Sequence, residues 1–106
     1  MLEENVIEVF ETPTFKKTFK RLSNPEKDLV DEEVDKITKD PDIGEQKKGD
    51  LSHLWVHKFN MNNQQVLLGY SWKEVKLELY LLNIGSHENF YRDTKNRRKQ
   101  DLKILR

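Results

Sequence analysis

The spacing of apolar residues in the first forty positions predicts one strand followed by two helices. Residues 6–10 are mainly β-branched or aromatic, which is typical of a strand. Thr12 followed by Pro13 is a favourable helix start, and Ser23-Asn24-Pro25 ends that helix and begins another, which Asp40-Pro41 ends. Apolar residues recur at helical spacing in both segments: Phe15, Phe19 and Leu22, then Leu29, Val30, Val34 and Ile37. The two helices should form a hairpin with a short connection.

The rest of the chain predicts a three-stranded meander and a last helix. Residues 42–50 are polar and read as a loop. Strand-like segments follow at 54–60, 65–72 and 76–84, separated by a turn at Asn62-Asn63 and by another near Lys73-Glu74. Gly85-Ser86 offers a break and a helix cap before a helix over 87–106. The predicted order is β-α-α-β-β-β-α, an α+β fold with the helix hairpin packed on a small, mainly antiparallel sheet.

Composition narrows the class of protein. A chain of 106 residues is expected to form one domain, spanning residues 1–106. There is no cysteine, which excludes disulfides, thiolate metal sites and cysteine nucleophiles. The three histidines lack a compact metal-ligand spacing, so we expect no metal and no cofactor. Residues 1–10 are acidic and lack a long apolar run, so we expect no signal peptide, no contact with a membrane and a cytoplasmic location.

Charge is unevenly distributed along the chain. The formal net charge is zero, but residues 86–106 hold seven Lys or Arg against three Asp or Glu, a balance of +4 that leaves −4 for the remainder. A basic end on an acidic body suggests an anionic partner at that end. A solvated helix whose faces carry salt bridges would give the same pattern.

Three stretches of the sequence resemble the RelE/ParE superfamily of bacterial toxins. They are PDIGEQKKGDL at 41–51, VHKF at 56–59 and GSHENFYRD at 85–93. The resemblance covers about residues 6–95, so that about 94–106 form a basic helical extension. It implies the toxin of a type II toxin–antitoxin system, which arrests growth under stress and is neutralised by a cognate antitoxin protein.

The resemblance leaves the toxin's target open. RelE-like members cleave mRNA on the ribosome, whereas ParE-like members inhibit DNA gyrase and cleave nothing. We expect a metal-independent mRNA endoribonuclease. The alternatives are a ParE-like gyrase inhibitor and a degenerate toxin that only binds its antitoxin. Because one fold serves both activities, the choice depends on the site.

Cleavage needs groups that move protons at the 2′-hydroxyl and at the leaving 5′-oxygen, and cations that stabilise the phosphorane. His87 follows the last strand and should lie at a helix start, where backbone N–H groups favour a phosphate. Tyr91, four residues on, shares its helix face. This spacing is similar to the C-terminal motif of the YafQ branch, which implies that His87 is the catalytic histidine. It also implies that Tyr91 is the aromatic position, which in that branch is a phenylalanine.

Further candidates lie on the first meander strand and in the loops. His57 and Lys58 are both candidate catalytic residues, but they point to opposite faces of a strand, so only one can face the site. His57 shares its face with Trp55 and Phe59, which also suits a histidine at the edge of the core. Candidate phosphate or RNA-binding residues are Arg92, Lys47 and Lys48, which could equally be surface charges.

Two features of the sequence weigh against the nuclease. RelE-like nucleases tend to be strongly basic, whereas this chain has no net charge. The segment 65–84 also contains no arginine, although RelE uses arginines on its later strands. His53, just before the meander, is a weaker candidate for a third site histidine. The nuclease prediction therefore rests mainly on the His87 region.

Overall fold

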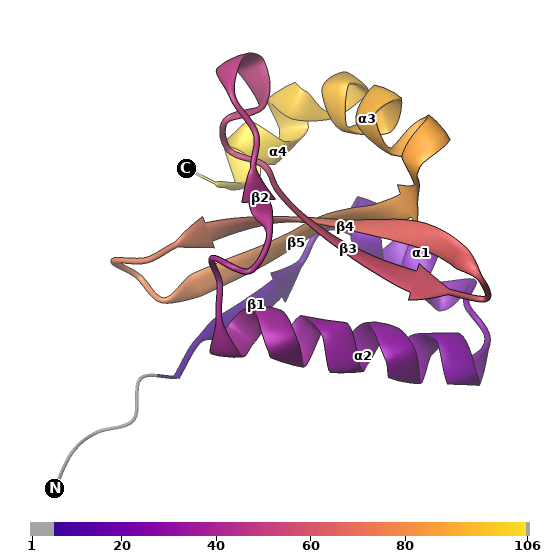
Figure 1. Ribbon diagram of the computed structural model, residues 1–106. Helices are drawn as coiled ribbons and strands as arrows, with labels where there is room; N and C mark the ends of the chain where they lie inside the picture. The colour runs from indigo at the N-terminus through magenta and orange to yellow at the C-terminus, as the bar shows by residue number, and fades with distance from the viewer. Residues whose placement is uncertain (1–5, 106) are drawn as a thin grey trace, which may run out of the picture.

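The computed structural model describes residues 6–105, which form a five-stranded sheet with helices on both faces (Figure 1). In chain order the elements are β1 (Glu8–Glu11), α1 (Pro13–Lys20), α2 (Asn24–Lys39), β2 (Glu45–Gln46), a 3-10 helix (Gly49–Leu51), β3 (Trp55–Met61), β4 (Gln64–Lys73), β5 (Glu78–Ser86), α3 (His87–Asn96) and α4 (Arg98–Ile104). The predicted α+β class is confirmed.

The strand order in the sheet is β1-β5-β4-β3-β2. Only β1 and β5 run parallel, and every other neighbouring pair is antiparallel. Helix α2 lies below the sheet in Figure 1, whereas α3 and α4 lie above it. The predicted helix hairpin and meander therefore occupy the expected places, and the C-terminal helices cover the face that the hairpin leaves open.

Local sequence signals explain where the helices and the first hairpin turn begin. The Thr12 side chain caps α1 by accepting from the Phe15 amide, and it also donates to carbonyls of β5. Ser23 and Glu26 cap α2 reciprocally, each side chain accepting from the other's backbone N–H. Asn62 and Asn63 both have positive φ, of 54° and 63°, as a tight turn between twisted strands requires.

The core is divided between the two faces of the sheet. The face toward α1 and α2 buries one cluster of apolar side chains: Phe15, Val30, Ile37, Val66, Leu68, Tyr70, Leu79, Leu81 and Ile84. The face toward α3 buries a smaller cluster: Leu54, Val56, Leu67, Leu82 and Phe90. Since neighbouring residues of a strand point to opposite faces, β4 contributes to both clusters, while β3 adds Val56 to the second and the partly buried Trp55 and Phe59 to the first.

Gly69 sets how closely α3 approaches the sheet. A Cβ atom at this position would lie 2.7 Å from the Phe90 ring and 2.9 Å from the Leu54 side chain. The missing side chain therefore leaves the space in which Phe90 packs. Because Phe90 lies between His87 and Tyr91 on α3, this contact also fixes the height of the candidate site above the sheet.

Three sequence-based expectations for irregular regions were wrong. The predicted loop over 42–50 contains β2 and the beginning of the 3-10 helix. The single helix predicted over 87–106 is two helices, because the chain leaves helical geometry at Arg97 (φ −99°, ψ 4°). No glycine or proline marks that break. Gly85 also belongs to β5, so the strand runs directly into α3.

Candidate functional site

His87, Tyr91 and Lys47 come together on the α3 face of the sheet. His87 is the first residue of α3 and is exposed, and its ring meets the Tyr91 ring edge-on with centroids 5.5 Å apart. The Lys47 ammonium lies 5.3 Å from the centroid of the Tyr91 ring, within the range of a cation–π contact. Tyr91 therefore lies between an imidazole and a cation that the sequence places forty residues apart.

Glu45 extends this group toward β3. Its carboxylate accepts a hydrogen bond from the Lys47 ammonium. Lys47 lowers the pKa of Glu45, with smaller contributions from the charges of Lys58 and Lys48. The same contact with Glu45, followed by the Tyr91 hydroxyl, raises the pKa of Lys47. Glu45 therefore stays ionised and Lys47 stays cationic across the neutral range.

Lys58 shares a pocket with Glu45. The pocket has a volume of about 380 Å³ and lies at the edge of β3, where β2 departs from it. It is lined by Ile43, Glu45, Val56, His57 and Lys58. Lys58 is exposed and, like Val56, belongs to the face that α3 covers.

Strand register brings Lys58 near the start of α3. Lys58 lies opposite Leu67, and Leu67 lies opposite Gly85, two residues before His87. Two strand spacings separate the Cα atoms of Lys58 and Gly85, which is roughly 10 Å. We call Lys58, Glu45, Lys47, Tyr91 and His87 the polar row. It carries two cations, a carboxylate, a phenol and an imidazole on one side of the sheet.

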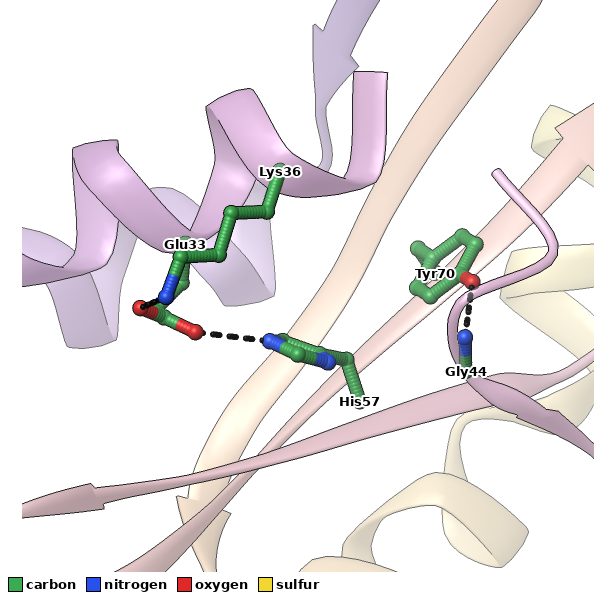
Figure 2. A network of polar contacts seen from close by, with 5 residues as sticks. All are labelled: Glu33, Lys36, Gly44, His57 and Tyr70. Carbon is green, nitrogen blue, oxygen red and sulfur yellow. Dashed lines mark hydrogen bonds and ion pairs between the residues drawn. The ribbon is translucent and has the colours of Figure 1, made fainter. Parts of the chain in front are cut away.

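His57 lies on the opposite face, toward α2 (Figure 2). Its Nε2 atom is 2.8 Å from Oε1 of Glu33, and the Lys36 ammonium donates to the other carboxylate oxygen of Glu33. Burial raises the pKa of Glu33, but the hydrogen bonds from Lys36 and His57 outweigh it, so the net pKa is lowered. His57 is buried beside the Phe59 ring. The structure thus places His57 and Lys58 on opposite faces of the sheet, as the alternation along β3 requires, and leaves His57 away from His87.

The remaining candidates lie outside the polar row. Arg92 is exposed, donates to the Asn89 side chain and lies 3.8 Å from the Asp93 carboxylate. Lys48 is exposed next to Lys47. His53 is half-buried before β3, and burial, followed by the charge of Arg98, lowers its pKa. These residues are available to bind phosphate, except that His53 is turned into the protein.

Sequence reasoning missed Glu45. It stands in a polar stretch with two lysines, where a carboxylate is usually a solvated surface charge. Only the pairing of Glu45 with Val56 across β2 and β3 shows that it faces the α3 side and lies close to Lys58. The one available signal was the alternation of Glu45 and Lys47, which places both side chains on one side of an extended segment.

Metal clusters and membrane-spanning helices are both absent from residues 6–105. No group of three or more histidine or acidic side chains in that range is arranged to hold a metal ion. None of the helices in the same range is long and apolar enough to cross a membrane.

The fold and the polar row define a small α+β protein that carries acid–base and cationic groups on one covered sheet face. The chain belongs to the family of ParE-like toxins of type II bacterial toxin–antitoxin systems, whose family model matches residues 9–95. The match runs from the second residue of β1 to the last but one residue of α3, and α4 lies beyond it.

Solved structures support the same fold. A doubly arginine-to-alanine substituted RelE toxin of E. coli in the free state superposes with a TM-score of 0.65 at 13% identity, over 85% of this chain and 96% of that one. The intact E. coli RelBE toxin–antitoxin complex gives a TM-score of 0.62 at 12% identity, over 76% and 96%. At these identities the similarity establishes the fold alone.

A segment of this chain also resembles part of a much larger eukaryotic protein. It is 42% identical over 67 residues to Dedicator of cytokinesis protein 9 of Homo sapiens and 40% identical over 67 residues to the Mus musculus protein. The match covers 62% of this chain but only 3% of either relative. So small a share carries no conclusion about the activity of this chain.

Proposed function

We propose that the protein is a cytoplasmic, growth-inhibiting toxin that cleaves mRNA on the ribosome without a metal ion. The observation that carries this proposal is the polar row, which joins His87 through Tyr91 and Lys47 to the Glu45 carboxylate. It combines a base, an acid and cations, which together suit proton transfer at a phosphodiester. The RelE fold neighbours add support at the level of the fold.

The polar row contains the groups that such a cleavage requires. Glu45 accepts the proton of the RNA 2′-hydroxyl, and the 2′-oxygen attacks the adjacent phosphorus. His87 gives a proton to the leaving 5′-oxygen, so that the products are a 2′,3′-cyclic phosphate and a 5′-hydroxyl end. Lys47 and Lys58 stabilise the extra negative charge of the phosphorane. Tyr91 holds His87 and Lys47 in place.

Other candidates take smaller roles in this scheme. Arg92 and Lys48 bind phosphates of the RNA on either side of the cleaved bond. His57 has no part in the chemistry, because it is engaged with Glu33 on the α2 face.

A ParE-like inhibitor of DNA gyrase is the second candidate function. The specific observations in its favour are the zero net charge and the absence of arginine from residues 65–84. A nuclease that works on ribosomal RNA surfaces benefits from a strongly basic surface, because phosphate contacts dominate its affinity.

The proposed partner in the cell is a cognate antitoxin, as RelB is for RelE in the similar complex. Exposed apolar side chains offer it surface to bury. They include Val9 and Phe10 on β1, Ile43 beside the pocket and Ile104 on α4. The basic C-terminal region would meet acidic residues of the antitoxin.

One experiment chooses between the two targets. The protein is expressed in bacteria without an antitoxin, and the 5′ ends of transcripts are mapped while the DNA-damage response is measured. We expect growth arrest with new 5′-hydroxyl ends in translated mRNA. Arrest with intact mRNA and an induced DNA-damage response would assign the protein to the gyrase inhibitors. Normal growth with folded protein present would contradict both functions.

A further inference from the structure

The outer wall of the pocket is a short segment that one tyrosine holds in place. Residues 41–44, which we call the strap, lead from the end of α2 to β2 around the edge of β3. Ile43 in the strap and Glu45 directly after it form one side of the pocket, and β3 forms the other. The position of the strap therefore determines where the Glu45 carboxylate lies.

The Tyr70 hydroxyl bonds to the strap at two points, of which Figure 2 shows the bond with Gly44. It donates to the Pro41 carbonyl at 2.6 Å and accepts from the Gly44 amide at 3.0 Å. Tyr70 is fully buried, and its ring packs against Trp55 at a centroid distance of 6.2 Å. Burial raises the pKa of Tyr70 to about 12, so the hydroxyl keeps the proton that it donates.

Gly44 brings the strap close to the sheet. A Cβ atom there would lie 2.8 Å from the Tyr70 hydroxyl oxygen and 2.9 Å from the Val56 carbonyl oxygen. A side chain at this position would therefore push the strap away from both groups. The bonded distance between Gly44 and Tyr70 depends on the absence of that side chain.

The other anchors of Glu45 are few. Strand β2 has two residues, Glu45 and Gln46, which pair with Val56 and Trp55. Beyond them the Lys47 N–H donates to the Leu54 carbonyl and the Gln46 side chain to the Ser52 carbonyl. Two residues of ladder give little stability by themselves, so an additional anchor next to Glu45 matters. The two bonds of Tyr70 supply it directly before the strand begins.

We propose that Tyr70 is a positioning residue, whose hydroxyl holds the strap and thereby keeps the Glu45 carboxylate against Lys47 and beside Lys58. The inference rests on the proposed function only in giving Glu45 a role in cleavage. Tyr70 touches neither the candidate acid–base groups nor the space where RNA would bind, and it acts through Gly44.

The test compares Tyr70→Phe with Tyr80→Phe. Both remove one hydroxyl from a strand tyrosine, but the Tyr80 hydroxyl donates to Glu78, away from the strap.

Carboxyl-carbon NMR follows the titration of Glu45, and amide hydrogen exchange follows the Gly44 N–H. In Tyr70→Phe we expect Gly44 to exchange about tenfold faster, the equivalent of one net hydrogen bond. We also expect the pKa of Glu45 to move up toward its ordinary value, because Lys47 no longer holds the carboxylate. Tyr80→Phe should change neither.

Gly44→Ala should also displace the strap, because the added Cβ atom would push it away from Tyr70 and Val56. It leaves every hydroxyl in place, so an upward shift of the Glu45 pKa in both variants would assign the effect to the strap. Unchanged Glu45 titration and unchanged Gly44 exchange in folded Tyr70→Phe would overturn the proposal. So would the same changes in Tyr80→Phe, because they would reflect general loosening of the sheet.

An activity measurement separates this proposal from the proposed function. With a cleavable RNA, Tyr70→Phe should lower kcat with little change in KM, since His87 and the lysines stay in place. Glu45→Gln should then cost less in the Tyr70→Phe background than in the wild type, because coupled residues are not additive. The NMR readouts need no RNA. A protein that cleaves nothing but shows the Glu45 shift would refute the nuclease and keep the positioning role.

Discussion

Nε2 of His57 lies 2.8 Å from Oε1 of Glu33, across the interface between β3 and α2. Both side chains are buried, and Lys36 holds the second carboxylate oxygen. This contact joins the helix hairpin to the edge of the sheet on the face opposite the polar row. We therefore interpret His57 as a structural residue, although it lines the pocket together with its neighbour Lys58.

The first prediction concerns Glu33→Gln. Loss of the charged partner should lower the free energy of unfolding by about 1–3 kcal/mol at neutral pH while leaving toxicity intact. Because the folded pKa of Glu33 is lowered from 4.5, its stabilisation is present above about that pH and is lost as pH falls through the folded pKa. Thermal melts across pH 3–7 measure this, with exposed Glu32→Gln as the control. A Glu33→Gln protein that is folded but not toxic would show that His57 takes part in the toxic activity.

The elements that could be predicted correctly from the sequence are those with local signals. Thr12 and Ser23 cap helices where expected, because side-chain capping involves residues only three positions apart. The sequence did not predict β2, since Glu45 and Gln46 have little strand propensity and are extended only because Trp55 and Val56 lie beside them. The Tyr70 contacts with the strap were equally invisible, since they join positions 26 and 29 residues apart.

In the candidate site, too, the sequence could predict relationships within one helix or strand but not contacts between distant segments. His87 and Tyr91 could be paired from their spacing on one helix, and their rings do meet. The opposite orientations of His57 and Lys58 could also be predicted from strand alternation. The contact of Lys47 with Tyr91 and the role of Glu45 required the tertiary structure, because a polar loop gives no direction to its side chains.

His87→Ala should abolish growth arrest. General acid–base groups contribute on the order of 10²–10⁴-fold in rate, and an exposed residue at a helix start contributes little to stability. A melting curve and a growth assay on the same variant test both parts, with Glu88→Gln, also exposed, as the control. A stable His87→Ala protein that stays fully toxic, with uncut mRNA, would remove His87 from any catalytic role.

Tyr91→Phe should have a small effect. The ring that supports Lys47 and meets His87 is kept, and only the hydroxyl beside Lys47 is lost. Tyr91→Ala removes the ring and should reduce RNA cleavage much more, because both neighbours lose their support. Cleavage rates of the two variants measure the difference. Equal losses in both would assign the role to the hydroxyl and make Tyr91 a candidate for proton transfer.

Asp101→Asn should stabilise the protein above neutral pH. Asp101 is 3% exposed, and within residues 6–105 its Oδ1 has no hydrogen-bond partner. Burial raises its pKa to about 6, partly offset by Arg97. A raised folded pKa means that its stability contribution is present below about pH 3.8 and is lost as pH rises through 6.

At pH 8 the Asp101→Asn variant should therefore be more stable than the wild type, by on the order of 1–3 kcal/mol, and the difference should shrink toward pH 4. Denaturant unfolding at the two pH values measures it, with exposed Asp93→Asn as the control. A variant less stable than the wild type at pH 8 would show that the charged carboxylate has a favourable partner.

The outer face of α1 should attract RNA. Apart from Pro13, the exposed side chains of α1 and of its C-cap are all cations, and the first turn has no acidic residue: Lys16, Lys17, Lys20 and Arg21. Within the described residues none of these cations forms an ion pair. Like charges four positions apart each cost about 0.2–0.5 kcal/mol of helix stability, so a cluster of cations on this face favours an anionic partner. Helix α1 packs along β5, the strand whose end leads into His87 at the start of α3, on the sheet face opposite α3 (Figure 1).

Replacing Lys16, Lys17 and Lys20 with glutamine should weaken binding of a labelled single-stranded RNA and flatten its salt dependence. Each lost phosphate contact removes about 0.7 from the slope of log affinity against log salt, so three should remove about 2. The control replaces three exposed lysines elsewhere, Lys39, Lys76 and Lys99, and changes net charge equally. Fluorescence anisotropy over a range of salt concentrations measures both. Equal losses of RNA affinity in the α1 variant and the control would show that only net charge matters. Undiminished binding in the α1 variant would exclude this face from RNA recognition.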